Sequence, residues 1–250
     1  MPDTTINFYN RCMTSLMGLL TGIAVSFNCA AAQPTIAVPE KVHDTSRDIF
    51  LPSLATRGEH SVGVKTLSLV NPQQFDINTK ALADRTLVVE LWFPTENHQE
   101  YSQYDNVTRL GKPFSLYAEA KRDATIKKVV LDKNSESQQT GYPLVILSHG
   151  YTGYRSLMFY LAEHLASHGY IVAGIDHTDS TNADVNASNP TSGFPSTLYN
   201  RTRDQQFVRQ QLLSESSPVR DVVNPKATGL IGYSMGGYGL IASIGGCYEF

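Results

Sequence analysis

The chain has 250 residues, of which 41% are hydrophobic and 17% are charged, a composition typical of a globular protein with a buried core. The 20 basic and 23 acidic residues give a net charge of −3, spread evenly along the sequence. This balance argues against a surface for nucleic acid or other polyanions, so we expect no nucleic-acid partner.

The N-terminus has the pattern of an export signal. An apolar run of signal-peptide length follows Arg11, and the small residues of "NCAAAQ" come after it. This pattern predicts a signal peptide over residues 1–32, cleaved after Ala32, and a secreted or periplasmic protein. The run is shorter than the about 20 apolar residues of a membrane span, so we expect no stable membrane anchor. Cleavage leaves Cys247 as the one cysteine of the sequence, which excludes an intrachain disulfide bond there.

The next part of the chain is rich in β-branched residues. After an N-terminal extension over residues 33–61, the stretches Val62–Val70 and Arg85–Pro94 predict an antiparallel pair of strands, because Asn, Pro and Gly bound them. Between Glu96 and Gly141 the chain turns polar and shows no sustained hydrophobic period. We interpret this segment as an excursion with room for one short helix.

The second half alternates apolar runs with helical patterns. An amphipathic helix ended by Gly169 separates the first two runs, and a helical stretch near residues 200–213 precedes the third. This order predicts a mostly parallel α/β sheet with crossover helices, in a domain of residues 62–250. The apolar runs, which predict strands buried on both faces, are Pro143–Ser148, Tyr170–Asp176 and Ala227–Ser234.

The stretch "GLIGYSMGGYG" joins the third apolar run to a helix of small residues. Its Gly232, Ser234 and Gly236 form the pattern G-x-S-x-G, which is a nucleophile elbow when a strand precedes it and a helix follows. A serine on so sharp a turn takes a strained backbone conformation, and side chains at the two glycine positions would collide with the turn. The context therefore favours Ser234 as a catalytic nucleophile over an inert turn.

A serine nucleophile needs donors for the oxyanion that it creates. In this arrangement one donor is the backbone N–H that follows the serine, here Met235, and the other comes from the loop after an earlier strand. The segment "SHGYTGYRS" occupies that loop, where Gly150 allows a tight bend and the N–H of Tyr151 is the expected second donor. We interpret His149 as a residue that orients this loop by hydrogen bonding, not as the general base.

Two further groups of polar residues have the spacing of functional sites. His164 and His168 lie four residues apart on one helix, but no third ligand is evident, so we interpret them as surface histidines and predict no metal. Asp176, His177 and Asp179 follow a strand at its carboxyl end, where we favour a loop anchor or pocket wall over a displaced acid and base. No loop has the pattern of a phosphate-binding loop, and we expect no cofactor.

The segment "PLVILSHGYTGYRSLMFYLAEHLASHGYIVAGIDHTDST", with "VELWFP" before it and "LIGYSMGG" after it, resembles one branch of the α/β-hydrolases. This branch contains the platelet-activating factor acetylhydrolases and the dienelactone hydrolase-like proteins, and the resemblance covers roughly Val62 to Gly246. It implies an α/β-hydrolase fold, Ser234 as nucleophile, and the N–H groups of Tyr151 and Met235 as the oxyanion hole. The pieces "GYTGYRS" and "SMGG" are also similar to secreted cutinases and polyester hydrolases.

The sequence departs from that family at its end. The catalytic triad of α/β-hydrolases runs along the chain as Ser, then Asp or Glu, then His. The residues after Ser234 contain no Asp and no His, and their one acid, Glu249, lies at the far end of the helix that the elbow begins. We therefore expect the acid and the histidine beyond residue 250, in a longer chain of which this sequence is a part.

These observations predict an exported serine ester hydrolase, such as an acetylhydrolase acting on lipid-like esters. A cutinase-type polyester hydrolase is the alternative within enzymes. A non-catalytic α/β-hydrolase-like binding protein is the alternative outside them, and the absent triad partners favour it. The sequence leaves open the acyl and alcohol preference, the oligomeric state, the organism, and whether the chain as written is active.

Overall fold

The computed structural model describes residues 56–96, 102–129, 141–185 and 187–246. The signal peptide expected over residues 1–32, most of the expected extension and both Cys247 and Glu249 lie outside the described residues. The first described strand begins at Ser61.

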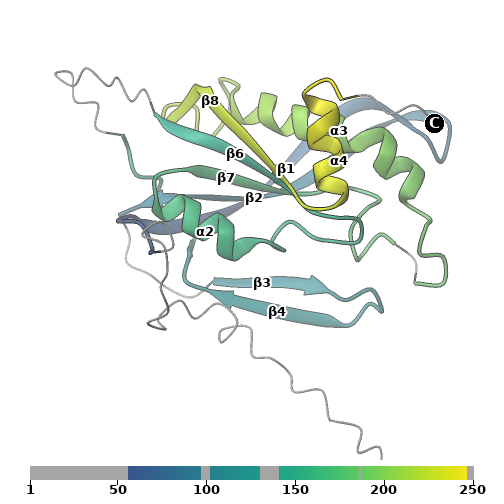
Figure 1. Ribbon diagram of the computed structural model, residues 1–250, viewed down its shortest axis with the longest axis horizontal. Coiled ribbons are helices and arrows are strands. Elements are labelled where there is room, and N and C mark those ends of the chain that lie inside the picture. The colour runs from purple at the N-terminus through teal and green to yellow at the C-terminus, as the bar shows by residue number, and fades with distance from the viewer. Residues whose placement is uncertain (1–55, 97–101, 130–140, 186, 247–250) are drawn as a thin grey trace, which may run out of the picture. The chain divides into compact units, whose positions relative to one another are not determined.

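A mixed β-sheet forms the centre of the domain (Figure 1). Two of its inner strands, β7 and β6, are parallel, and β8 continues the parallel part beyond β6. On the other side β2 pairs antiparallel with β7, and the long β1–β2 hairpin confirms the expected antiparallel entry into the sheet. In spatial order the strands are β5 (Lys121–Arg122), β1 (Ser61–Asp76), β2 (Ala81–Thr95), β7 (Ile171–Asp176), β6 (Tyr142–Ser148) and β8 (Val223–Gly232).

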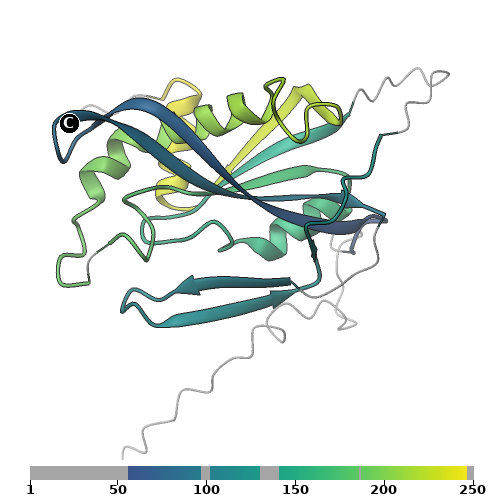
Figure 2. The same ribbon diagram turned by 180° about the vertical axis from the view of Figure 1, so that it is seen from behind.

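The apolar runs of β6 and β7 are continuous because both faces of the sheet are covered. Leu144 and Ile146 point into one cluster of buried side chains, whereas Val145 and Leu147 point into the other. The first cluster includes Phe207, Val208 and Leu212 of α3 (Phe194–Leu212), and the second includes Phe159, Ala162 and Ala166 of α2 (Phe159–Ser167). The two crossover helices therefore lie on opposite faces, and α4 (Met235–Ser243) packs beside α3 (Figures 1 and 2).

The expected short helix between Glu96 and Gly141 is wrong for the described part of that segment, which forms a hairpin. Strands β3 (Ser102–Val107) and β4 (Pro113–Ala118) pair antiparallel on the α2 side of the sheet (Figure 2). In β3 only alternate side chains are buried, so the polar residues between them hid the two-residue period. Tyr104 anchors the hairpin: its hydroxyl donates to the buried Glu163 of α2 at 2.8 Å.

Two further boundaries differ from expectation. The strand expected at Ala227–Ser234 is β8, which runs from Val223 to Gly232. It was expected to be buried on both faces but is only partly buried, and among the described strands it pairs with β6 alone. The helix expected from residue 200 begins at Phe194, because Pro195 fits the first turn of a helix, where its missing N–H is not needed.

Within the described ranges, no helix combines the length and the apolar character that a membrane span requires.

Candidate active site

Ser234 lies on the turn between β8 and α4 with a strained backbone. Its φ of 52° and ψ of −117° belong to a region that residues with a side chain rarely adopt, and its side chain is exposed. The strand before it and the helix after it complete the arrangement of a nucleophile elbow. The strain thus presents the hydroxyl to solvent at the carboxyl end of β8, where open α/β sheets bind their ligands.

The two glycines of the pattern are required by close packing. A methyl group on Gly232 would overlap the backbone of Gly236, and one on Gly236 would overlap the carbonyl oxygen of Ser148, at the end of β6. A methyl group on Gly150 would lie 3.1 Å from Cβ of Ser234. The absence of these side chains therefore lets the elbow and the loop after β6 approach each other.

The two expected oxyanion donors lie on the elbow and on this neighbouring loop. The N–H of Met235 is at the first residue of α4, and the N–H of Tyr151 follows the close approach of Gly150 to Ser234. Within the described part of the chain, neither N–H donates a hydrogen bond to a protein group. The expected role as oxyanion donors requires that neither N–H be bonded to the protein, and the positive end of the α4 dipole would add to their effect.

The loop after β6 is tied to the loop after β7. The N–H of Thr152 donates to the carbonyl of Ser180 at 2.9 Å, and the N–H of Asn182 donates to the carbonyl of Gly153 at 3.1 Å. At the end of the loop, the Arg155 guanidinium binds the Asp176 carboxylate at 2.6 Å. The two loops thus form one unit beside the elbow.

A chain of buried hydrogen bonds lies beneath this unit. Nε2 of His177 is 2.8 Å from Oγ of Ser148, and Nδ1 of His177 is 2.9 Å from Oδ2 of Asp204. Arg85 donates two hydrogen bonds to the same Asp204 carboxylate, at 2.7 and 2.9 Å. We name Ser148, His177, Asp204 and Arg85 the buried relay. It has the order of a catalytic triad, but Ser148 is only 1% exposed, so no ester can reach it.

Burial shifts the pKa values of His177 and Asp204 in the relay. Burial lowers the pKa of His177 well below its usual value, and the charges of Arg201 and Arg85 act in the same direction. Burial likewise raises the pKa of Asp204, although hydrogen bonds from Arg85 oppose the rise. A neutral His177 that donates from Nδ1 to the carboxylate has its Nε2 free to accept the hydroxyl proton of Ser148.

The other sequence-based candidates lie away from the elbow or serve the loops. His164 on α2 and His168, which caps the C-terminus of that helix, have ring centroids 4.7 Å apart, and the described residues contain no cluster of three or more potential metal ligands. His177 is a buried anchor, and Asp179 accepts hydrogen bonds from Arg85 and from Ser196. These contacts agree with the favoured interpretation of that segment, a loop anchor or pocket wall.

Two members of the relay, Asp204 of α3 and Arg85 of β2, were not predicted from the sequence. A signal for Asp204 was present, since polar residues repeat at helical spacing along α3. The buried polar residues of α3 are Ser196, Thr197, Asn200, Arg201, Asp204 and Gln205.

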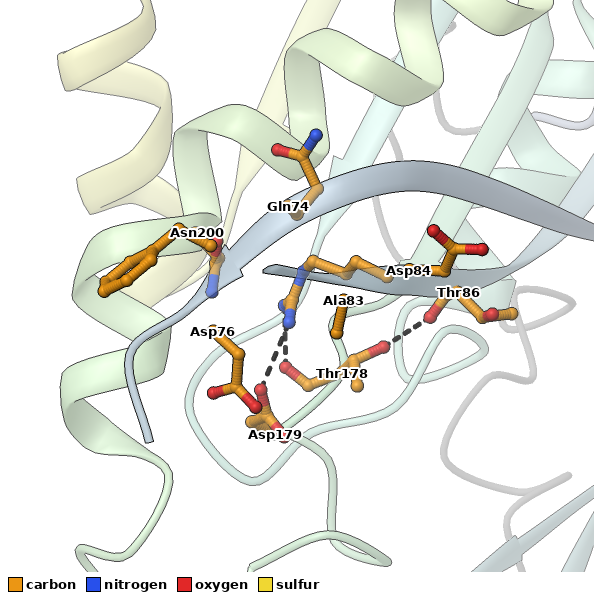
Figure 3. A pocket seen from close by; sticks show the side chains of 10 residues that line it. Gln74, Asp76, Ala83, Asp84, Thr86, Thr178, Asp179 and Asn200 are labelled. Carbon is orange, nitrogen blue, oxygen red and sulfur yellow. Dashed lines mark hydrogen bonds and ion pairs between the residues drawn. The ribbon is translucent and has the colours of Figure 1, made fainter. Parts of the chain in front are cut away.

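Arg85 of the buried relay also lines a cavity of about 260 Å³, which Figure 3 shows with Thr178, Asp179 and Asn200 around it. Asp179 and Thr178 line it from the loop after β7, and Asn200 lines it from α3. Neither Ser234 nor Tyr151 is among its lining residues. The cavity therefore adjoins the buried relay, and the exposed elbow is a separate surface.

Comparison with known proteins supports the resemblance seen in the sequence. A family model for platelet-activating factor acetylhydrolase, isoform II, matches residues 54–209, more than half of the chain. The match contains the loop of Tyr151 and the whole buried relay. It ends before Ser234, so the assignment of the nucleophile depends on the local geometry of the elbow.

Individual relatives cover smaller parts. A platelet-activating factor acetylhydrolase of Cavia porcellus is 38% identical over 101 residues, which are 37% of this chain and 21% of that protein. Cutinase est1 of Thermobifida alba is 32% identical over 101 residues, 40% of this chain and 29% of that protein. The match thus spans about a fifth to a third of the curated relatives' length.

Among solved structures, a ferulic acid esterase from Streptomyces cinnamoneus superposes with a TM-score of 0.56 at 25% identity. The superposition covers 76% of this chain and 57% of that one. Together with the mixed sheet and its crossover helices, it confirms the expected α/β-hydrolase fold.

The glycines of the elbow give a matched pair of substitutions. Gly236→Ala places a methyl group against the Ser148 carbonyl, so we expect it to lower the free energy of unfolding by about 1–3 kcal/mol. Gly237→Ala meets its nearest backbone atom, the Gly232 oxygen, at 3.3 Å and gains helix propensity, so we expect a change within about 1 kcal/mol. Urea unfolding of both variants measures the difference, and equal stabilities would contradict the packing account.

The neutral His177 gives a pH dependence of stability. The pKa of His177 is lower in the folded state, so below about pH 6.5 the unfolded chain binds a proton that the folded chain does not. The free energy of unfolding therefore decreases as the pH is lowered. The loss approaches on the order of 1 kcal/mol per pH unit. Buried carboxyls whose pKa is raised, such as Asp204, have the opposite effect on stability as the pH is lowered. The contribution of His177 is therefore isolated by comparing the wild type with His177→Gln.

We expect His177→Gln to be less stable than the wild type at pH 7, and the difference between the two to narrow as the pH falls to 5. Urea unfolding at several pH values measures it. A difference that stays constant with pH would show that His177 is not held neutral.

Proposed function

We propose that this chain, which belongs to the platelet-activating factor acetylhydrolase, isoform II, family, is a serine carboxylic ester hydrolase whose nucleophile is Ser234. The observation that carries the proposal is the backbone of Ser234, whose positive φ holds an exposed hydroxyl between β8 and α4. The relatives described as an acetylhydrolase, a cutinase and a ferulic acid esterase support the reaction class.

In the proposed reaction, Oγ of Ser234 attacks the ester carbonyl and the N–H groups of Tyr151 and Met235 bind the oxyanion that forms. Collapse of this intermediate expels the alcohol and leaves an acyl group on Ser234. Water then attacks the acyl group and releases the acid, which restores the serine. The residues of the chain need no cofactor for these steps.

The reaction also needs a base that takes the hydroxyl proton of Ser234 and returns a proton to the alcohol. His149 and His177, the histidines of the two loops beside the elbow, are 2% and 1% exposed and bonded to other groups. We therefore assign the base to a histidine outside the described residues, with a carboxylate to orient it.

We further propose that the protein is exported and acts on short-acyl esters, including acetyl esters of lipid-like alcohols. The N-terminal leader pattern supports export. The family match and the acetylhydrolase relative support the acyl preference. The 32% identity to a cutinase supports one alternative, hydrolysis of polyesters.

Ser234→Ala tests the nucleophile in the protein encoded by the complete gene. We expect the variant to lose at least about 10⁴-fold in ester turnover, because the acyl-enzyme path is lost. A fluorophosphonate should label Ser234 of the wild type, as located by mass spectrometry of peptides. Ser243→Ala, in the same helix, is the matched control and should retain turnover. Labelling of a different serine, or near-normal turnover of Ser234→Ala, would contradict the assignment.

The substrate proposal predicts an order of activities. Acetyl esters should have a higher kcat/KM than butyryl esters, and butyryl esters a higher value than palmitoyl esters. The assay compares the three with polyester film alongside. Efficient erosion of the film, or a preference for palmitoyl esters, would favour the polyester or long-chain alternatives. A folded wild type that neither binds a fluorophosphonate nor hydrolyses any ester would favour the non-catalytic binding protein.

A further inference from the structure

Three successive carbonyl groups at the junction of β6 and its loop are held by hydrogen bonds. The carbonyls of residues 148, 149 and 150 each accept a hydrogen bond. The donors, in that order, are the N–H of Tyr233 at 3.0 Å, Nη1 of Arg201 at 2.9 Å and Nδ1 of His149 at 2.5 Å. The third carbonyl also accepts the N–H of Gly153, at the longer distance of 3.2 Å. The orientation of each peptide in this stretch is therefore determined by a specific partner.

The third of these hydrogen bonds acts directly on the proposed oxyanion hole. The carbonyl of Gly150 and the N–H of Tyr151 belong to one planar peptide, in which they point in opposite directions. A donor that holds the Gly150 carbonyl therefore also sets the direction of the Tyr151 N–H. That N–H is the donor that the proposed function assigns to the oxyanion.

The position of the proton on His149 follows from its second contact. Nε2 of His149 accepts the backbone N–H of His177 at 3.3 Å, so the one proton of a neutral ring must be on Nδ1. Burial lowers the pKa of His149 well below its usual value, and the neighbouring His177 and Arg201 act in the same direction. Asp204, which faces the same region, opposes the shift.

The ring of His149 is also fixed in place by packing. Its centroid is 5.2 Å from that of His177 in an edge-to-face contact. On another side a methyl group at Gly153 would lie 2.7 Å from Nδ1, so only glycine leaves room for the ring there. The buried relay fixes His177, and His177 in turn fixes His149.

We propose that His149 is a positioning residue of the oxyanion hole, whose Nδ1–H holds the Gly150–Tyr151 peptide so that the Tyr151 N–H points to the oxyanion on Ser234. This inference rests on the proposed function. The Gly150 carbonyl also accepts the N–H of Gly153 at 3.2 Å, and the loop has further attachments at Thr152 and at Arg155; none of these involves the His149 imidazole. Loss of the imidazole donor therefore leaves the loop attached and leaves the Gly150 carbonyl with its longer hydrogen bond from Gly153 alone, so this peptide is held less firmly in the orientation that the oxyanion needs.

Two substitutions separate the donor from the volume of the ring. His149→Leu fills the space without a donor, whereas His149→Asn places an amide N–H near the position of Nδ1. In the protein encoded by the complete gene, we expect His149→Leu to lower kcat by about 10²- to 10³-fold with little change in KM, the effect of losing one oxyanion donor. We expect His149→Asn to recover at least about tenfold of that loss. His168→Leu, at the exposed end of α2, is the control and should retain kcat.

A transition-state analogue distinguishes positioning from a general structural role. A trifluoromethyl ketone forms a tetrahedral adduct with the serine, and its oxyanion occupies the hole. Its inhibition constant should rise across the variants in proportion to the fall in kcat/KM. An unchanged inhibition constant with a reduced kcat would overturn the proposal. So would a His149→Leu variant with wild-type kcat, or a His149→Asn variant no better than it.

One measurement needs no variant and no activity. ¹⁵N NMR of the wild-type imidazoles should show His149 neutral between pH 6 and 8, with its proton on Nδ1. A proton on Nε2, or a charged ring, would overturn the proposal even if the enzyme is active. If instead the wild type hydrolyses no ester but shows the Nδ1 tautomer, the proposed function fails and the hydrogen bond from His149 to Gly150 stands.

Discussion

The buried carboxylate of Asp204 joins the elements that carry the candidate site. It lies on α3 and binds Arg85 of β2 and His177 after β7, and through His177 it reaches Ser148 at the end of β6. A buried charge with no partner would cost several kcal/mol, so the carboxylate, the guanidinium and the imidazole must fold into place together. This requirement brings the carboxyl ends of β6 and β7 together with the crossover helix α3.

The elbow depends on that arrangement because it packs against the end of β6. A methyl group on Gly236 would overlap the carbonyl oxygen of Ser148, whose hydroxyl belongs to the relay. The N–H of Tyr233 donates to the same carbonyl. The strained backbone of Ser234 costs on the order of 1–3 kcal/mol, and such strain persists only where the surrounding contacts determine it. The contacts of Ser148 on both sides supply part of that constraint.

The strands that must be apolar, and the positions that must be glycine, could be predicted from the sequence. The central strands are continuous apolar runs because both faces are buried, and the elbow glycines are needed where backbones approach closely. The β3–β4 hairpin was missed because it buries only alternate residues of a polar segment. The relay was missed because its carboxylate, Asp204, pairs with Arg85, which is 119 residues away in sequence. No local pattern specifies such a partner.

The most direct test of this account is a crystal structure of the wild-type protein after reaction with a fluorophosphonate. The account predicts a covalent bond from Oγ of Ser234 to phosphorus. It also predicts a phosphoryl oxygen about 2.7–3.1 Å from the backbone nitrogens of Tyr151 and Met235, with the Gly150 carbonyl still bonded to His149. A phosphoryl oxygen that points away from both nitrogens, or a phosphonate on a different serine, would contradict it.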